Sequence, residues 1–511
     1  MPEPDGAPLK CFFPSGLRTW GWAVQLYAAR SRASWGIGDL GDLRSLAQDT
    51  ARSNGVILIN PLHASTPRLP LEPSPYFAGS RCFHDPLYLR IEEVPGAPEL
   101  GDLERLAREG RALNEGRRID RDRVQRLKMT GLEQLWERFR GDDDFEAYRA
   151  EMGAPLEDFA TYVALTETHG GSWRAWPSEY RHPGAPDVDG FRRAERTSVR
   201  FHEWVQWLVD VQLARTAATG NVVHDLAVGV DPDGADAWIW QDVFADQVSV
   251  GAPPDDYNPE GQDWAALAFD PWALVESSFE PFVYLFRSMM RHAAGLRIDH
   301  VMGLFRLFWI PAGAPATEGA YVRYPARRML DIVAEESRRA GCYVVGEDLG
   351  TVEPGVREEM SARSMLSYKL MWFEEDPPAT YPELCMAAPN THDLPTTAGL
   401  WTGEDSHTQI ELGLDPNEEF KEKIIRRIMR QTGVDRAAPV SEVVNRSYEA
   451  LAASPSALVM GSLEDALKVA ERHNQPGTIG PWNWSTALPL PLEEVLRHPR
   501  TQELSQKLSS R

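Results

Sequence analysis

Short apolar runs alternate with helical patterns along most of this chain, and this alternation constrains the fold more than any other feature. The first example is an apolar run at Trp20–Tyr27, a helical pattern at about Asp42–Ser53 and a second apolar run at Gly55–Pro61. A strand, a helix and a strand at this spacing form a βαβ unit, whose two strands lie parallel in one sheet. Six further strands are predicted, at Asn221–Val230, the start of Gly295–Leu304, Tyr343–Gly350, Leu370–Phe373, Met386–Pro389 and Leu458–Leu463. The predicted fold is α/β, a single (β/α)8 (TIM) barrel over residues 1–511.

Two segments interrupt this rhythm and are predicted to be insertions between barrel strands. Residues 62–200, after the second strand, contain mainly helical patterns, and the six basic residues of Asn114–Lys128 are interpreted as a solvated face. Residues 231–280, after the third strand, are predicted to be rich in loops. An irregular stretch of that length inside a compact chain is usually functional.

Composition excludes several classes of partner. The net charge of −23 argues against nucleic acid and anionic membranes, because binding phosphates needs a basic surface. Four cysteines without CxxC spacing are typical of reduced thiols in a cytoplasm, and no signal peptide or membrane-spanning run is predicted. Seventeen tryptophans are many for this length; most are expected in the core, and a few are expected to stack on sugar rings.

Three acidic residues, Asp299, Glu347 and Asp393, follow three of the later strands. Alternation along GLRIDHVMGL puts Arg297 and Asp299 on the same face of their strand, about 7 Å apart. A neighbouring arginine keeps a carboxylate ionised, as a nucleophile requires, although a structural ion pair at a strand end has the same pattern. Because (β/α)8 barrels carry their chemistry at the carboxyl ends of the strands, three acids in this position favour an active site.

Two carboxylates that face each other across a glycosidic bond can catalyse reactions of sugar acetals. One stays ionised to attack the sugar carbon or activate water, while burial and a charged neighbour keep the other protonated. A third carboxylate and adjacent histidines can hold sugar hydroxyls.

Other chemistries leave patterns that this sequence lacks. It has no HExxH motif, no DxDxDG loop and no close carboxylate cluster, so no metal site is predicted. It has no GxSxG elbow of a serine hydrolase and no glycine-rich phosphate loop of a nucleotide-binding protein. No cofactor is predicted.

Several stretches resemble motifs of a known enzyme family. Gly295–Leu304, Val345–Gly350 (VGEDLG) and Asn390–Thr396 (NTHDLPT) are similar to motifs of the 4-α-glucanotransferases, also called amylomaltases or disproportionating enzymes, which form glycoside hydrolase family 77 in the α-amylase clan. The resemblance covers nearly the whole chain, and further matching stretches are Val24–Leu43, Ser74–Leu89, His224–Trp238 and Gly251–Trp264. Each motif alone is moderately specific, whereas their common order and spacing are strongly specific.

The resemblance implies a retaining transfer of α-1,4-glucan segments between maltooligosaccharides, or to glucose, through a covalent glycosyl-aspartate. It implies that Asp299 is the nucleophile, Glu347 the general acid/base and Asp393 the transition-state stabiliser. In a retaining enzyme the carboxyl groups of Asp299 and Glu347 are expected about 5–5.5 Å apart. The substrate is expected to be a maltooligosaccharide or a starch-type α-glucan.

The same matching implies six substrate-binding residues: Tyr76, Asp233, Gln262, Trp264, Arg297 and His392. Arg297 would support Asp299, and His392 would hold the sugar at the cleaved bond with Tyr76 stacking nearby. Gln262 and Trp264 would line the acceptor side, within a flexible lid around Asp255–Trp264.

The chain departs from the family pattern at two places. Ile479–Trp484 (IGPWNW) keeps the Asn-Trp pair but lacks the preceding acidic residue and proline. Leu71, Glu72 and Pro73 stand before Ser74 where some relatives carry a tyrosine, which puts a secondary groove for large cyclic glucans in doubt. A hydrolase of the same clan, a non-catalytic glucan-binding protein and a transferase for modified sugars remain alternatives, and the sequence leaves the oligomeric state open.

Overall fold

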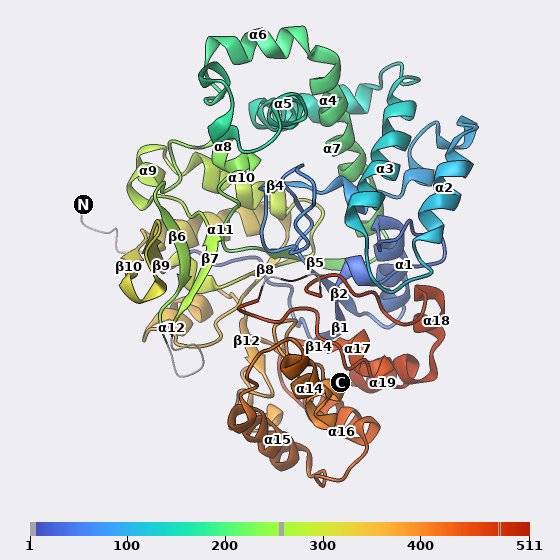
Figure 1. Ribbon diagram of the computed structural model, residues 1–511. Coiled ribbons are helices and arrows are strands. Elements are labelled where there is room, and N and C mark those ends of the chain that lie inside the picture. Colours follow the sequence, from blue (N-terminus) through green and yellow to red (C-terminus); the bar gives the residue numbers. More distant parts are fainter. Residues whose placement is uncertain (1–6, 255–259, 479, 481) are drawn as a thin grey trace.

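A barrel of eight parallel strands forms the centre of the computed structural model, which describes residues 7–254, 260–478, 480 and 482–511 (Figure 1). In chain order the strands are β1 (Thr19–Val24), β2 (Val56–Ile59), β5 (Asn221–Leu226), β8 (Gly295–Ile298), β11 (Tyr343–Gly346), β12 (Ser367–Leu370), β13 (Cys385–Ala388) and β14 (Leu458–Ser462). The strands neighbour one another in this order, and β14 pairs with β1. A bridge between Val345 and Leu366 joins β11 to β12 and closes the barrel. The predicted (β/α)8 barrel is confirmed.

The barrel interior is packed with side chains. Val56, Val223, Tyr343, Met386 and Met460 belong to one buried cluster contributed by several strands. The strands are short and rich in branched residues because both faces of a parallel barrel are covered.

Helices enclose the barrel, and the local sequence explains where they begin and end. The Asp39 side chain accepts hydrogen bonds from the amides of Gly41 and Asp42 and so caps α1 (Leu40–Ala51). Helix α11 (Ala326–Ala340) ends at Gly341, whose φ of 65° suits glycine. Further helices around the barrel are α7 (Arg196–Ala217), α10 (Glu280–Met289), α12 (Val356–Ala362), α16 (Val440–Ala452), α17 (Leu463–Leu467), α18 (Leu492–Arg497) and α19 (Pro499–Ser509).

The segment between β2 and α7 is mainly helical and covers one side of the barrel (Figure 1). It holds the paired strands β3 (His63–Ala64) and β4 (Ser80–His84) and the helices α2 (Leu103–Ala112), α3 (Arg121–Trp136), α4 (Asp143–Met152), α5 (Ala154–His169) and α6 (Pro186–Ala194). The expectation of a solvated face over Asn114–Lys128 is wrong in part, because Arg121 and Lys128 are buried. The Lys128 ammonium donates to the carbonyls of Leu87 and Leu89 and so stays hydrogen-bonded inside.

The segment after β5 contains more regular structure than expected. It includes α8 (Ala235–Ile239), β6 (Val248–Ala252), β7 (Gln262–Ala266) and α9 (Pro271–Glu276). Strands β6 and β7 form an antiparallel sheet with β9 (Arg306–Pro311) and β10 (Ala320–Arg323). Residues 255–259 of the predicted lid lie outside the described residues, whereas Gln262 and Trp264 belong to β7.

The sixth barrel strand lies three residues earlier than predicted. The apolar run at 370–373 suggested a strand there, but Met371 and Trp372 are buried in the turn that follows β12. The remaining helices are α13 (Thr397–Thr402), α14 (Glu404–Glu411) and α15 (Glu418–Thr432). Among the described residues, the structure contains no helix with the length and apolar character needed to cross a membrane.

Candidate active site

The candidate site lies at the carboxyl ends of neighbouring barrel strands. Asp299 directly follows β8, Glu347 directly follows β11, and Asp393 lies in the loop after β13. These positions follow from the parallel barrel, which brings the ends of all its strands to one face. All three acids line one pocket of about 1700 Å³. This volume exceeds the usual range for small-molecule sites and suits an extended ligand made of several linked units.

Arg297 connects two carboxylates at the base of this pocket. On adjacent strands, Arg297 is in register with Asp225 of β5. Its guanidinium donates to Asp225 at 2.6 Å and to Asp299 at 2.9 Å, and its side chain is only 5% exposed. Burial disfavours a charged Arg297, but Asp225 and Asp299 outweigh this effect and raise its pKa well above the ordinary value. Arg297 therefore supplies a fixed positive charge beside Asp299.

Glu347 is held by two backbone amides. Its Oε2 accepts a hydrogen bond from the His300 amide at 2.9 Å, and its Oε1 accepts one from the Leu349 amide at 2.6 Å. Burial, and then the negative charge of Asp299, raise the pKa of Glu347 to about 7. Glu347 can therefore be protonated near neutral pH, as a general acid must be.

Asp393 is half-exposed at the mouth of the pocket. It lies 3.3 Å from the His392 Nε2 and accepts a hydrogen bond from the Asn474 amide group at 2.8 Å. Desolvation raises the pKa of Asp393, but the charge and hydrogen bond of His392 outweigh it and lower the pKa to about 2. Desolvation likewise opposes a charge on His392, and Asp393 more than compensates and raises the imidazole pKa.

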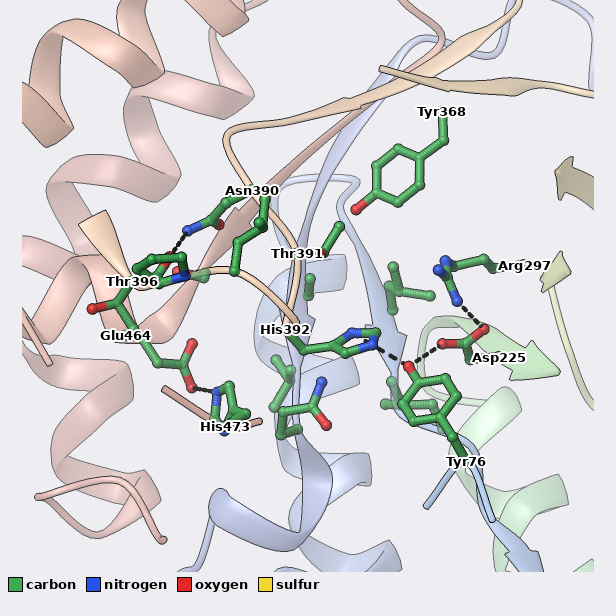
Figure 2. A pocket seen from close by; sticks show the side chains of 18 residues that line it. Tyr76, Asp225, Arg297, Tyr368, Asn390, Thr391, His392, Thr396, Glu464 and His473 are labelled. Carbon is green, nitrogen blue, oxygen red and sulfur yellow. Dashed lines mark hydrogen bonds and ion pairs between the residues drawn. The ribbon is translucent and has the colours of Figure 1, made fainter. Parts of the chain in front are cut away.

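Three aromatic rings form one wall beside these acids. Tyr76 stacks on His392 with ring centroids 4.7 Å apart, and the Trp484 ring lies 5.5 Å from Tyr76 and 5.4 Å from His392. The Tyr76 hydroxyl donates to Asp225 at 2.7 Å and lies 3.3 Å from the His392 Nδ1 (Figure 2). A continuous set of contacts thus joins Arg297, Asp225, Tyr76 and His392 under the pocket, around an inner cavity of about 70 Å³.

Most of the residues predicted from the sequence meet at this pocket. Tyr76, Gln262, Trp264 and His392 line it, and Arg297 reaches it through Asp299. Trp264 lies edge-on to His300, 5.4 Å away, and its indole donates to Gln262 at 3.3 Å.

Asp233 is the exception among the predicted residues. It is not among the residues that line the pocket. Its carboxylate pairs with Arg68 at 3.2 Å and accepts a hydrogen bond from Ser172. The structure therefore brings it to the loop that leads to Tyr76, and not to the three acids.

Sequence reasoning missed three residues of the site. Asp225 lies one residue before the end of β5, so the rule that found the other strand-end acids could have found it. Asn474 lies in a loop far from the other residues in sequence, and no local pattern marks it as a neighbour of Asp393. Trp484 belongs to the Asn-Trp pair of the family pattern, but that resemblance gave it no role beside Tyr76. Among the described residues, no group of three or more His, Cys, Asp or Glu side chains could hold a metal ion.

Comparisons with known proteins agree on one family. Residues 24–491 match the model of glycoside hydrolase family 77, described as 4-alpha-glucanotransferase. The 4-alpha-glucanotransferase of Mycobacterium tuberculosis (strain ATCC 25618 / H37Rv) is 42% identical over 96% of this chain and 75% of its own length. The amylomaltase of Corynebacterium glutamicum superposes with a TM-score of 0.85 and 33% identity, over 96% of this chain and 75% of that one.

A second solved structure supports the fold alone. The amylomaltase of Streptococcus agalactiae, in complex with acarbose, superposes with a TM-score of 0.80 at 18% identity, over 97% of this chain and 99% of that one. The family match and the two close relatives settle the classification. The chain therefore belongs to glycoside hydrolase family 77 and is a glycosyl-transferring enzyme of the 4-alpha-glucanotransferase type.

Proposed function

We propose that this enzyme transfers α-1,4-glucan segments between maltooligosaccharides by a retaining double displacement with Asp299 as the nucleophile. The observation that carries this proposal is the contrast between two neighbouring carboxylates. Arg297 donates a hydrogen bond to Asp299, whereas burial and the charge of Asp299 raise the pKa of Glu347 to about 7. Such a pair supplies an ionised nucleophile and a protonated acid at the same pH.

In the first step Glu347 gives its proton to the oxygen of the scissile bond, and that bond breaks. The Asp299 carboxylate forms a bond to C1 of the sugar, and the shortened glucan leaves. In the second step Glu347, now ionised, takes the proton of an incoming 4-hydroxyl, whose oxygen displaces Asp299 from C1. The product keeps the original anomeric configuration, and both carboxyl groups return to their starting states.

Asp393, His392 and Tyr76 hold the donor sugar during these steps. Asp393 is ionised because its pKa is about 2, so it can accept hydrogen bonds that strengthen as positive charge develops on the ring. His392 and Tyr76 present a stacked wall beside it. We assign Asp233 an indirect role, since its pair with Arg68 fixes the loop that carries Tyr76.

Gln262 and Trp264 form the acceptor side of the pocket in this proposal. A transferase must exclude water while it holds an acceptor sugar, and a segment that closes over the site does both. Both residues lie on strand β7 and line the same pocket as Asp299 and His300.

We propose a single catalytic barrel with insertions at 62–200 and 231–280. The four buried, unpaired cysteines fit the cytoplasm that we propose as its location.

Incubation with maltotriose tests the proposed function. Transfer produces a ladder of longer and shorter oligomers together with free glucose. Decay of maltotriose to glucose and maltose without longer products would instead identify a hydrolase. If a modified oligosaccharide, assayed in parallel, is a much better donor than maltotriose, the enzyme is a specialised transferase. The Asp299→Asn variant serves as the matched control and must lose the ladder, because an amide cannot form the glycosyl ester.

A further inference from the structure

Trp484 adopts a backbone conformation that needs support from its surroundings. Its φ of 55° lies in the left-handed region, which is uncommon for a bulky residue. Its side chain is buried and packs against Tyr76 and His392. Strained residues of this kind persist where neighbouring contacts fix them, and they are frequent at functional sites.

Two hydrogen bonds hold the Trp484 backbone, one on each side. Its amide donates to the His473 carbonyl at 2.7 Å. Its carbonyl accepts from the Arg121 guanidinium at 2.6 Å. Arg121 begins helix α3 in the helical segment between β2 and α7, so this bond joins residues 363 positions apart in the chain.

Arg121 is itself fixed by a closed set of contacts. It is buried, and its guanidinium lies 5.1 Å from the centroid of the Tyr27 ring. The Tyr27 hydroxyl lies 3.1 Å from the His473 Nδ1, and the His473 carbonyl accepts from Trp484. A buried guanidinium that bonds a carbonyl and faces an aromatic ring has little freedom to move.

We propose that Arg121 is a positioning residue for the donor-sugar site: it fixes Trp484, and Trp484 in turn fixes the Tyr76 and His392 rings. This inference rests on the proposed function, in which Tyr76 and His392 hold the donor sugar. Small displacements of groups that hold a reacting sugar lower the rate steeply. Arg121 therefore links helix α3 to the donor-sugar site through its bond to Trp484.

A purely structural role is the alternative, because several contacts join the same two segments. Ile119 donates to Ser485, and Ala487 donates to Arg117, through their backbones. The Arg117 side chain donates to the Ala487 carbonyl at 2.9 Å and pairs with Glu471. Arg117 thus crosses the same junction four residues before Arg121 but bonds to Ala487 and not to Trp484, which makes it a matched control.

The experiment compares Arg121→Met, Arg121→Lys, Arg117→Met and the unaltered protein. We expect Arg121→Met to lower kcat for maltotriose about tenfold, with a smaller change in KM, because the ring wall is displaced in the reacting complex. Arg121→Lys should recover much of the loss, since an ammonium can still donate to the Trp484 carbonyl. Arg117→Met should stay within about twofold. Each kcat is calculated per molecule that can form the covalent intermediate, so that misfolded protein does not lower the measured value.

A crystal structure of Arg121→Met gives a second readout that does not depend on activity. The inference requires the Trp484 ring to leave its contact with Tyr76 and His392 in that variant. Unchanged rings, or equal losses in Arg121→Met and Arg117→Met, would overturn it. If Arg121→Met does not fold, Arg121→Lys and Trp484→Ala replace it. We then expect near-full activity and unmoved rings in Arg121→Lys and a lower kcat in Trp484→Ala. An unchanged kcat in Trp484→Ala would overturn the inference. An unaltered protein that fails to transfer maltotriose would overturn the proposed function, whereas the crystal structure would still decide the role of Arg121.

Discussion

The backbone amide of His300 donates a hydrogen bond of 2.9 Å to the Glu347 carboxylate. His300 directly follows Asp299 and has a φ of 44°, in the left-handed region that turns the chain after β8. The residue after the proposed nucleophile thus fixes the proposed acid. Since the contact is made by the backbone, it uses no donor atom of the His300 side chain, and the turn after β8 holds the Glu347 carboxylate in place.

The pH dependence of transfer follows from the protonation state of Glu347. Its pKa of about 7 means that the acid form is lost as the pH rises through neutrality. We expect kcat/KM for maltotriose to fall about tenfold for each pH unit above about 7. The measurement is a kcat/KM profile from about pH 5 to about pH 9.

A donor with a fluoride leaving group provides the control for this profile. Fluoride departs without a proton, so the first step with an α-maltosyl fluoride should not weaken at alkaline pH. A maltotriose profile that stays flat to about pH 9, or identical profiles for both donors, would exclude Glu347 as the acid.

The stability of the enzyme should change with pH in the same direction as transfer, because it depends on the same proton on Glu347. The pKa of Glu347 is about 7 in the folded enzyme and 4.5 in its ordinary state, so the folded state retains a proton that the unfolded chain releases between these values. Stability therefore falls as the pH rises through this window. We expect the effect of Glu347→Gln on stability to be more favourable at about pH 8 than at about pH 4, by up to about 3 kcal/mol. Urea unfolding at both pH values measures it, and an equal effect at both would contradict the assignment.

Arg297 should contribute to the stability of the fold as well as to the reaction. It bonds Asp225 and Asp299, and Asp225 is only 4% exposed. Removal of one partner from a buried ion pair typically costs about 3–5 kcal/mol, because the remaining charge is uncompensated. We expect a loss of this size for Arg297→Met in urea unfolding. Adding Asp225→Asn should restore part of the stability without restoring transfer. An Arg297→Met variant as stable as the unaltered protein would show that the ion pair is dispensable for stability.

Two substitutions of Tyr76 separate its hydroxyl from its ring. Tyr76→Phe removes the hydrogen bond to Asp225 but keeps the ring stacked on His392. Tyr76→Ala removes both. We expect kcat/KM for maltotriose to fall about tenfold in the first and on the order of a hundredfold in the second. Equal losses in the two variants would show that the ring contributes nothing beyond its hydroxyl.

The sequence predicts the barrel and its acids well because both depend on local patterns. Branched apolar runs identify the strands, and the parallel topology then brings the residues after β8, β11 and β13 to one face. The strand β12 was misplaced because Ser367 and Lys369 interrupt its apolar pattern, while the stronger run at 370–373 is a buried turn.

The contacts that join distant segments could not be predicted in the same way. Nothing near Arg121 in the sequence indicates that it bonds to Trp484, or that a basic stretch contains two buried cations. Asp225 was hidden inside an apolar strand, although its position relative to Arg297 follows at once from the strand register. Such residues become visible only when the segments are assembled.

Trapping the covalent intermediate tests most directly whether Asp299 is the nucleophile. In Glu347→Gln, a maltotriosyl fluoride should still react with the nucleophile, because its leaving group needs no acid, whereas the second step lacks its base and should stall. Mass spectrometry of the protein and its peptides measures the adduct. We expect one maltotriosyl group attached to the peptide that contains Asp299. An adduct on Asp393, or release of a product of inverted configuration without any adduct, would contradict it.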